Sequence, residues 1–366
     1  MNYEQVFCGD APAVMSELAG SGLREQVRLV YADPPFNTRR DHYRFRDRRS
    51  DSAWTDLIER TASAARTLLR QEGSFWLHID DQQLGPARAA CDTALGRDNY
   101  IGTVVWEKTR RPSYLHPHLA STTDFLLVYG KDARKLRPFT SGTSQPGKRI
   151  PLAHRGNQLV DLSFPASTVT FNCSDGIYSA GDHSSPGIPA ALLEDVVIVN
   201  GRNQTPLRLR LPSRYSPARI EQLLEAKAQF LVPKVPFRPS YLSPGGKPKL
   251  VQNLWSWQSD PEMPTNEDAY KEQGRTFAKP FPGAKPVGLI RRIIELATED
   301  GDLVLDPFGG SGTTAVAALE TGRSFILVEE RADIVNEYIG PRLEAFGRVP
   351  ASAVTQARVP GPVPCP

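Results

Sequence analysis

The residues best suited to chemistry lie in a short proline-rich segment near the start of the chain. Asp33-Pro34-Pro35-Phe36 follows the apolar run 27–32, which is typical of a buried strand. The Asp33 carboxylate and the Pro34 carbonyl could accept hydrogen bonds from both N–H groups of an amine, while Phe36 offers a flat face to a planar ring. Such bonds favour a pyramidal nitrogen whose lone pair can attack an electrophilic carbon. Because consecutive prolines fix φ, this geometry is set before a substrate arrives.

A second motif, DPFGGSGTT at residues 306–314, follows another apolar run near the end of the chain. A sharp turn after a parallel strand puts backbone N–H groups and a helix N-terminus at the carboxyl edge of the sheet, where α/β proteins bind ligands. Glu329, which ends the next predicted strand, is placed to bind ribose hydroxyls. The spacing alone fits a nicotinamide cofactor nearly as well as S-adenosylmethionine. The candidate cofactor-binding residues here are Asp306, Phe308, Gly309, Gly310, Ser311, Gly312, Thr313 and Glu329.

Together, the two motifs resemble those of the DNA amino-methyltransferases that use S-adenosylmethionine. Asp-Pro-Pro-Phe corresponds to the family's catalytic motif, and DPFGGSGTT followed by GRSFILVE at 322–329 corresponds to its cofactor motif almost letter for letter. The catalytic motif comes first, an order that resembles the β class, with its type III modification subunits and solitary relatives. The resemblance is strong over residues 6–131 and 281–338 and least specific between them.

The resemblance implies roles for individual residues. Asp33, Pro34, Pro35 and Phe36 would hold the target base. Asp306 and the Gly310 region would face the methionine end of the cofactor, Phe308 would lie beside it, and Glu329 would bind its ribose.

Two further residues are assigned to the cofactor by the same resemblance. Asp10, in a Gly9-Asp10 turn, would face the adenine amino group, although an ordinary turn acid fits the sequence equally well. Lys285 precedes Pro286 at the start of a predicted helix and corresponds to the family's KP motif. No metal is expected in the reaction.

The pattern of elements predicts an α/β fold, a Rossmann-like methyltransferase sheet with circularly permuted motif order and an inserted loop-rich target-recognition domain. Strand-like and helix-like runs alternate over residues 1–135, the expected catalytic half, and over 279–347, the expected cofactor-binding half. Residues 136–278 are rich in Pro and Gly, with short strand candidates and one clear helix from Pro217 to Phe230. Residues 348–366 are rich in Pro and Ala, which predicts a disordered tail.

Positive charge is concentrated in the middle of the chain. Residues 134–256 contain sixteen Lys or Arg and seven Asp or Glu, whereas the whole chain of 366 residues has a net charge of +3. A solvated basic surface would explain the composition alone, but beside the two motifs it favours double-stranded DNA as the partner. The candidate DNA-binding residues are Arg39, Arg40 and Arg44 after the catalytic motif, Lys108, Arg110 and Arg111 after Trp106, and Arg214, Lys247 and Lys249 in the middle lobe.

The expected activity is site-specific methyl transfer from S-adenosylmethionine to the exocyclic amine of a base flipped out of the duplex. The resemblance favours adenine N6 over cytosine N4, because Asp rather than Ser opens the catalytic motif. Three other classes are less consistent with the sequence. An RNA or protein methyltransferase needs no long basic lobe, an oxidoreductase would need a phosphate-binding turn in the first half, and a noncatalytic DNA-binding protein has no need of Asp33.

Composition also limits the location and the partners that we expect. No apolar run approaches the roughly 20 residues that a membrane span requires, and the start lacks a basic leader followed by an apolar core. We therefore expect no membrane association and a cytoplasmic, nucleoid-associated protein of a prokaryote. A second copy of the chain and a restriction subunit are further candidate partners beside DNA.

Overall fold

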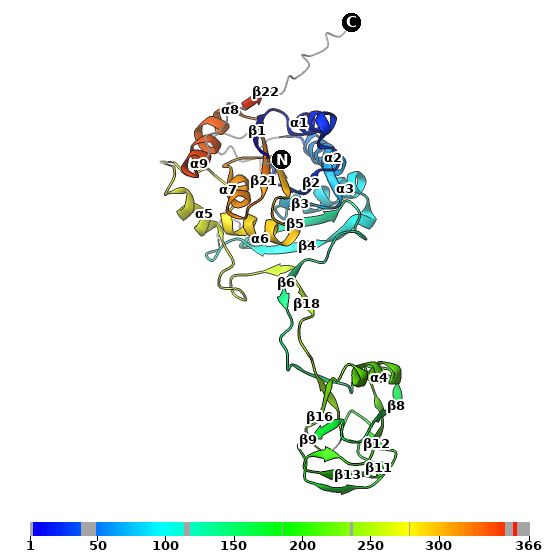
Figure 1. The fold of residues 1–366 in the computed structure, drawn as a ribbon. Coiled ribbons are helices and arrows are strands. Elements are labelled where there is room, and N and C mark those ends of the chain that lie inside the picture. The colour runs from blue at the N-terminus through cyan, green and yellow to red at the C-terminus, as the bar shows by residue number, and fades with distance from the viewer. Residues whose placement is uncertain are drawn as a thin grey trace. The chain divides into compact units, whose positions relative to one another are not determined.

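The computed structural model describes residues 3–37, 49–112, 118–184, 186–234, 237–277, 279–347 and 354–356. The chain forms two compact units, one of Met1–Phe139 with Leu250–Pro366 and one of Thr140–Lys249 (Figure 1). The second unit is shorter than the expected middle lobe of 136–278. Residues after 249 return to the first unit because strand β19 (Leu254–Trp255) pairs with β4 (Tyr100–Glu107) and buries Trp255.

The first unit is built on one mixed sheet, which has nine strands among the described residues. All of its strands run in one direction except β5, which is antiparallel to both of its neighbours, β4 and β3. This mostly parallel α/β sheet confirms the fold class expected from the sequence. Its spatial order is β19, β4, β5 (Thr123–Gly130), β3 (Leu69–Ile79), β2 (Val27–Ala32), β20 (Leu303–Asp306), β21 (Ser324–Glu329), β1 (Glu4–Cys8) and β22 (Val354–Gln356).

Helices cover both faces of this sheet, because its central strands bury side chains on both sides. In β2, Val30 and Ala32 belong to one apolar cluster with residues of the helices at 11–18, 51–68 and 84–95, whereas Leu29 and Tyr31 belong to another with residues of the helices at 287–297, 313–320 and 340–345. No helix in the described part of the chain is long and apolar enough to cross a membrane. The helices of this unit are α1 (Ala11–Leu18), η1 (Ala19–Leu23), α2 (Asp51–Leu68), α3 (Leu84–Leu95), η2 (Arg97–Asn99), α5 (Asn266–Gln273), α6 (Val287–Ala297), α7 (Thr313–Glu320), α8 (Ala332–Ile334), η3 (Val335–Ile339) and α9 (Gly340–Ala345).

Strands from the two ends of the sequence interleave at the centre of the sheet. β20 and β21, from the last quarter of the chain, lie between β2 and β1, from the first. Val30 pairs in parallel with Leu305, and Val6 pairs in parallel with Leu327. The carboxyl ends of all four strands therefore meet at one edge, which brings the two sequence motifs together.

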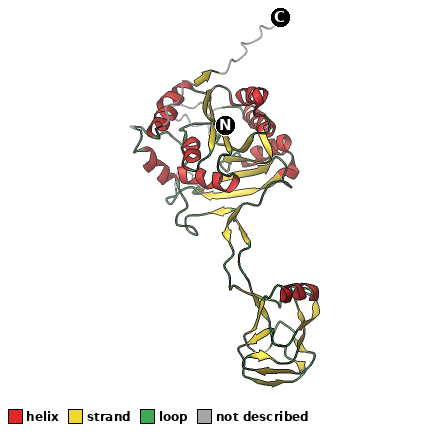
Figure 2. Cartoon of the chain, in the orientation of Figure 1, coloured by secondary structure: helices red, strands yellow, loops and turns green. Residues whose placement is uncertain are grey.

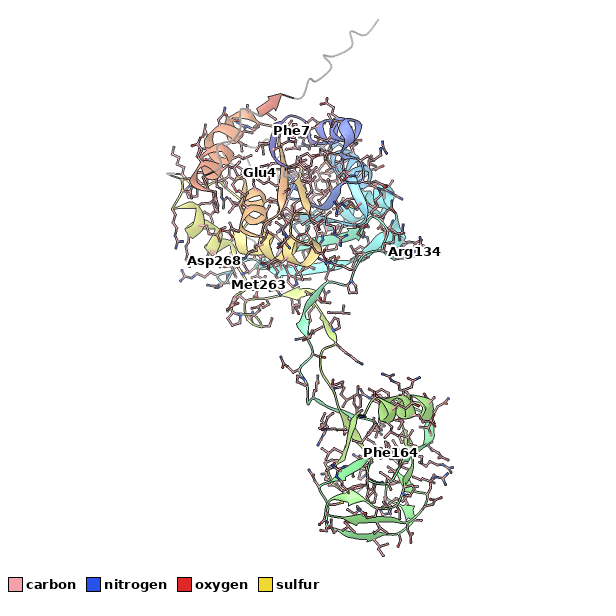
Figure 3. The ribbon with its side chains drawn as sticks, in the orientation of Figure 1. Glu4, Phe7, Arg134, Phe164, Met263 and Asp268 are labelled. Atoms are coloured by element: carbon pink, nitrogen blue, oxygen red, sulfur yellow. The ribbon has the colours of Figure 1, made fainter. Side chains whose placement is uncertain are left out.

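Among the residues that the structure describes, the regular elements of the second unit are short strands and one helix, and loops connect them (Figure 2). Two sheets share one apolar core that contains the fully buried Phe164 (Figure 3). The alternation of Leu207, Leu209 and Leu211 with exposed residues marks a strand with one buried face. The strands are β10 (Gly176–Tyr178), β13 (Val196–Val199), β14 (Arg202–Asn203), β9 (Val169–Phe171), β16 (Gln229–Val232), β17 (Ser240–Leu242) and β7 (Arg149–Pro151) in one sheet; β11 (Gly181–Asp182), β12 (Ala191–Leu192), β15 (Leu207–Pro212) and β8 (Leu159–Phe164) in the other; and the pair β18 (Pro248–Leu250) and β6 (Thr140–Thr143).

Two boundaries differ from the sequence expectation. The helix predicted to reach Phe230 ends earlier, as α4 (Pro217–Glu225), because Lys227 takes a positive φ of 54° and Phe230 joins strand β16. In the tail predicted to be disordered, Val354–Gln356 form β22, which pairs in parallel with β1. The rest of residues 348–366 lie outside the described ranges.

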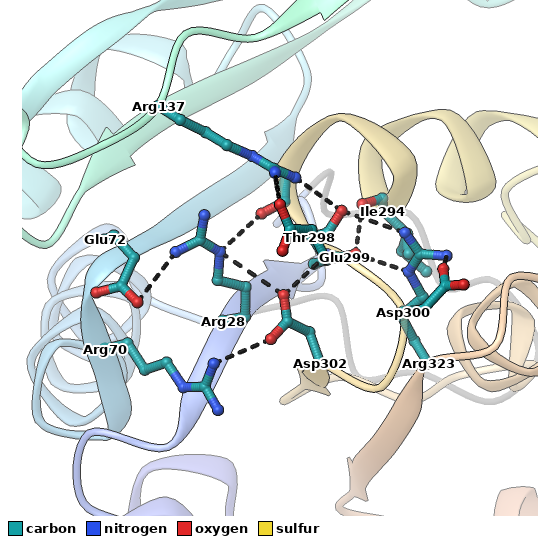
Figure 4. A network of polar contacts seen from close by, with 11 residues as sticks. Arg28, Arg70, Glu72, Arg137, Ile294, Thr298, Glu299, Asp300, Asp302 and Arg323 are labelled. Atoms are coloured by element: carbon teal, nitrogen blue, oxygen red, sulfur yellow. Dashed lines mark hydrogen bonds and ion pairs between the residues drawn. The ribbon is translucent and has the colours of Figure 1, made fainter.

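A charged network joins the two halves of the first unit at the amino ends of β2 and β20 (Figure 4). The buried Arg28 places its Nε 3.2 Å from the Ala297 carbonyl and 3.9 Å from Asp302 Oδ2. Asp302 also pairs with Arg70 at 3.0 Å and accepts a 2.8 Å hydrogen bond from the Glu299 backbone N–H. Residues far apart in sequence therefore depend on one largely buried carboxylate.

We expect Asp302→Ala to lower the free energy of unfolding by about 3 kcal/mol, because it removes the largely buried carboxylate beside Arg28 and leaves that guanidinium with the Ala297 carbonyl and the half-exposed Glu72. Urea unfolding measures the difference. Arg134→Ala is the control: its side chain is 91% exposed beside Asp132, so we expect a change below about 1 kcal/mol. Equal losses in the two variants would contradict this role for the network.

Candidate active site

A cavity of about 840 Å³ lies at the carboxyl edge where β1, β2, β20 and β21 end. Its size falls in the range of small-molecule sites. Both ends of the sequence line it, so the structure brings together most of the predicted catalytic and cofactor residues. Those along its wall are Asp10, Asp33, Pro34, Pro35, Phe36, Lys285, Asp306, Phe308, Gly309, Gly310, Ser311, Thr313 and Glu329.

The proline segment is held from behind by helix α2. The buried Trp54 donates a 2.6 Å hydrogen bond from Nε1 to the Pro35 carbonyl. Asn37, with a positive φ of 54°, accepts a 2.9 Å bond from the Arg49 backbone N–H through Oδ1. Side-chain bonds therefore fix both the middle and the end of this turn, and Asp33 and Phe36 face the cavity from a rigid loop.

Lys285 meets the Asp33 carboxylate directly. Its ammonium donates to both Oδ1 and Oδ2, each at 2.8 Å, and lies 4.9 Å from the centre of the Phe36 ring. The lysine is only 8% exposed. The ammonium predicted to lie on the cofactor side of the site thus contacts the predicted catalytic acid.

A buried polar chain that sequence reasoning missed lies behind Phe36. Tyr31 Oη is 2.9 Å from His78 Nδ1, and His78 Nε2 lies 3.4 Å from Asp124 Oδ2 without hydrogen-bond geometry. The His78 ring is roughly parallel to Phe36, with centroids 6.2 Å apart. A lone His in the apolar run SFWLHI carries no signal beyond an occasional buried polar residue, so only the fold reveals these contacts.

Burial and charge set the protonation of this chain. Burial lowers the pKa of His78, and the nearby Lys285 charge acts in the same direction, so the imidazole is neutral at neutral pH. Burial alone would raise the pKa of Asp124, but its contacts with His78 and Lys108 lower it to about 2. The polar chain behind Phe36 therefore contains a neutral His78 ring and an ionised Asp124 carboxylate.

Glu329, the acid predicted to bind ribose, accepts a hydrogen bond from the glycine turn that follows β20. Gly310 has a φ of 49° and donates its N–H to Glu329 Oε2 at 2.9 Å. Glu329 Oε1 accepts from the Arg331 N–H at 3.1 Å, and burial raises the pKa of this carboxyl. Gly312, with a φ of 77°, is the N-cap residue of α7 and is not among the residues lining the cavity.

Asp306 is the most perturbed acid of the cavity. Its Oδ1 accepts a 2.9 Å bond from the Phe308 N–H, and its Oδ2 accepts a 2.5 Å bond from the Thr314 hydroxyl. Burial nevertheless raises its pKa to about 7. A buried carboxyl with a strongly raised pKa in a ligand-sized cavity is typical of a functional residue.

Asp10 has two structural contacts. Its Oδ2 accepts from the Ala13 N–H at 3.3 Å, which caps α1, and lies 3.4 Å from Arg60 Nη2. It also lines the cavity. Both readings of this residue, turn acid and cofactor contact, therefore fit its position.

The predicted DNA-binding residues differ in their local surroundings. Lys108 pairs with the buried Asp124 at 2.7 Å, and Arg110 lies 3.6 Å from Asp268. Trp106, which precedes them, is fully buried and donates to the Pro264 carbonyl, so it belongs to the core. Arg111, Arg214, Lys247 and Lys249 are exposed. Arg39, Arg40 and Arg44 lie outside the described residues.

A sequence profile of the N6/N4 DNA methylase family matches residues 27–339 of this chain. The match spans both motifs and the unit between them. The chain therefore belongs to the DNA methylase family, and the resemblance noted in its motifs is confirmed. S-adenosylmethionine is the methyl donor of this family.

Individual relatives match less of their own length. The type III restriction-modification enzyme EcoP15I Mod subunit of Escherichia coli is 24% identical over 84% of this chain and 54% of that protein. The DNA adenine methyltransferase YhdJ of Escherichia coli K12 is 34% identical to this chain, over 32% of this chain and 35% of the length of YhdJ. The chain spans about half the length of the Mod subunits that it matches. Among solved structures, the M1.HpyAVI complex with S-adenosylmethionine aligns over 93% of this chain and 99% of that chain, with a TM-score of 0.42 and 15% identity.

We expect Asp306→Asn to stabilise the protein at high pH. The pKa of Asp306 is about 7 in the folded protein and about 3.9 in an unfolded chain. The contribution of this carboxyl to the free energy of unfolding is therefore fully present below about pH 4. It decreases as the pH rises from about 4 towards about 7 and is constant above that. The Asn variant escapes this loss, so its advantage in the free energy of unfolding should be about 4 kcal/mol at pH 8 and smaller at pH 5.

Urea unfolding at the two pH values measures this advantage. Asp98→Asn is the matched control, because Asp98 is exposed and lies away from the cavity. An advantage of Asp306→Asn that is the same at pH 5 and pH 8 would contradict the raised pKa.

Proposed function

We propose that this chain transfers a methyl group from S-adenosylmethionine to the exocyclic amine of a base in DNA, with adenine N6 as the favoured target. The observation that carries the proposal is the shared cavity. Asp33 and Phe36 line it from β2, and the Asp306 turn and Glu329 line it from β20 and β21. An amine acceptor and a cofactor-type turn thus face one space.

The residues of the cofactor half fit the donor that the family uses. The Gly310 turn allows close approach of a ligand to the backbone, and Glu329 is oriented by two backbone N–H groups with its carboxylate at the cavity wall. Asp306 offers a buried carboxyl to the positively charged methionine end. We assign Phe308 and Asp10 to the adenosine part. When bound there, S-adenosylmethionine would supply a methyl group activated by its sulfonium.

Asp33 and Pro34 act on the other reactant. They accept hydrogen bonds from the two N–H groups of the amine, which favours a nitrogen lone pair directed at the methyl donor. Phe36 stacks against the base. Asp33 then takes up the proton that the amine loses. A base inside a duplex cannot reach this cavity, so it must leave the stack, at a cost of a few kcal/mol.

Adenine is favoured over cytosine on two grounds. Asp33 opens the catalytic motif, where the family resemblance associates Asp with adenine. The relative YhdJ, named a DNA adenine methyltransferase, is similar to this chain over part of its length. Both amines meet the same demands at Asp33, so the choice between the bases must depend on contacts elsewhere on the ring.

We assign recognition of the DNA sequence to the second unit. It carries the exposed Arg214, Lys247 and Lys249, whose charges suit phosphate contacts. Similarity to Mod subunits of type III restriction-modification enzymes makes a restriction subunit a candidate partner, and a second copy of the chain another.

The test is methyl transfer from radiolabelled S-adenosylmethionine to unmodified duplex DNA, with RNA and no acceptor as parallel reactions. We expect label in DNA alone. Asp33→Ala should reduce the rate at least about a hundredfold, because general-base and hydrogen-bond contributions of this kind are worth that much. It should leave the affinity for S-adenosylhomocysteine, measured by calorimetry, within about twofold, since Asp33 is assigned to the target amine rather than to the cofactor.

Asp98→Ala serves as the control for loss of an exposed carboxylate. Nucleoside analysis of the labelled DNA separates N6-methyladenine, the expected product, from N4-methylcytosine. Full activity of Asp33→Ala would refute the catalytic assignment, and label in RNA alone would refute DNA as the substrate.

A further inference from the structure

The proposed chemistry gives no role to the buried Lys285 ammonium, which lines the cavity. The Lys285 ammonium is 8% exposed and donates to both carboxylate oxygens of Asp33 at 2.8 Å. Those oxygens are the atoms that must accept the target amine. The lysine therefore competes with the substrate for the same acceptors.

The position of the ammonium over Phe36 strengthens this reading. Its distance of 4.9 Å from the ring centre is within the range of a cation–π contact. An amine on a base stacked against Phe36 would also lie over this ring while donating to Asp33. Lys285 Nζ thus meets both conditions that define the amine position, contact with the carboxylate and location over the aromatic face.

We propose that the Lys285 ammonium holds the place of the target amine on Asp33, and that a base enters the site by displacing it. This inference rests on the proposed function, since it takes Asp33 as the amine acceptor. The displaced ammonium keeps a nearby acceptor in the Gly283 carbonyl, which is 3.4 Å from Nζ. The exchange makes and breaks hydrogen bonds only.

Displacement by this route selects for donors. An exocyclic amine can replace an ammonium on a carboxylate, because both present N–H groups. A base with a carbonyl oxygen at that position would direct lone pairs at Asp33 and could not compensate for the lost ion pair. The lysine would therefore help the site to accept adenine or cytosine and to reject thymine.

A different role predicts a different result. If Lys285 remained on Asp33 during the reaction, it would be a positioning residue, and its loss would lower kcat with little change in KM for DNA. As a place-holder, its loss frees Asp33 for the amine and lowers KM. An arginine there should bind the carboxylate more firmly through two parallel hydrogen bonds and raise KM.

The experiment compares Lys285→Met and Lys285→Arg with the unsubstituted chain. The acceptor is bacterial genomic DNA amplified without modification, and the donor is radiolabelled S-adenosylmethionine. We expect KM for DNA to fall about tenfold in the Met variant and to rise about tenfold in the Arg variant, each equivalent to about 1.4 kcal/mol. Calorimetry with S-adenosylhomocysteine checks that each variant still folds and binds the cofactor product.

Opposite shifts of KM support the proposal, since misfolding cannot produce them. An unchanged KM with a reduced kcat in Lys285→Met overturns it in favour of a positioning role. Loss of S-adenosylhomocysteine binding in Lys285→Met overturns it in favour of a cofactor role. If only Lys285→Arg loses S-adenosylhomocysteine binding, the KM for DNA of Lys285→Met alone decides: a fall supports the proposal and no change overturns it. Absence of DNA methylation by the unsubstituted chain refutes the proposed function itself, and the inference with it.

Discussion

The structure depends on one topological constraint, the insertion of β20 and β21 between β2 and β1. Parallel pairing of Val30 with Leu305 and of Val6 with Leu327 fixes the register of strands from opposite ends of the chain. Because the four strands run in the same direction, their carboxyl ends share one edge. Asp33, Asp306 and Glu329 therefore line a single cavity, although most of the sequence separates the first from the other two.

Acidic side chains gather along this cavity, and three of them, Asp33, Asp306 and Glu329, are accommodated in different ways. Asp33 is paired with the Lys285 ammonium, Glu329 accepts two backbone N–H bonds, and Asp306 has a pKa raised to about 7 by burial. At the position assigned to the base, the charge of Asp33 is thus neutralised by an ammonium. At the position assigned to the cofactor, Asp306 is readily protonated.

Much of this organisation is readable from the sequence, because the elements of the first unit carry strong local signals. The apolar runs that end at Ala32 and Asp306, together with the glycine turn, predict the strands and the edge that they share. The helix expected to reach Phe230 is too long, because apolar spacing continues past the residue where Lys227 turns the chain. Lys285 is assigned to the cofactor side by its motif, and only the packed structure shows its ammonium on Asp33.

The contacts of His78 lie beyond sequence reasoning for the same reason. They join three separate strands and require the tertiary structure to form. The most direct test of the whole account is a crystal structure with S-adenosylhomocysteine and a duplex whose target base has left the stack. The account predicts the ligand sulfur between the Asp306 turn and Asp33, with the base amine on the Asp33 carboxylate. A ligand bound on another surface, or a base that does not reach Asp33, would contradict it.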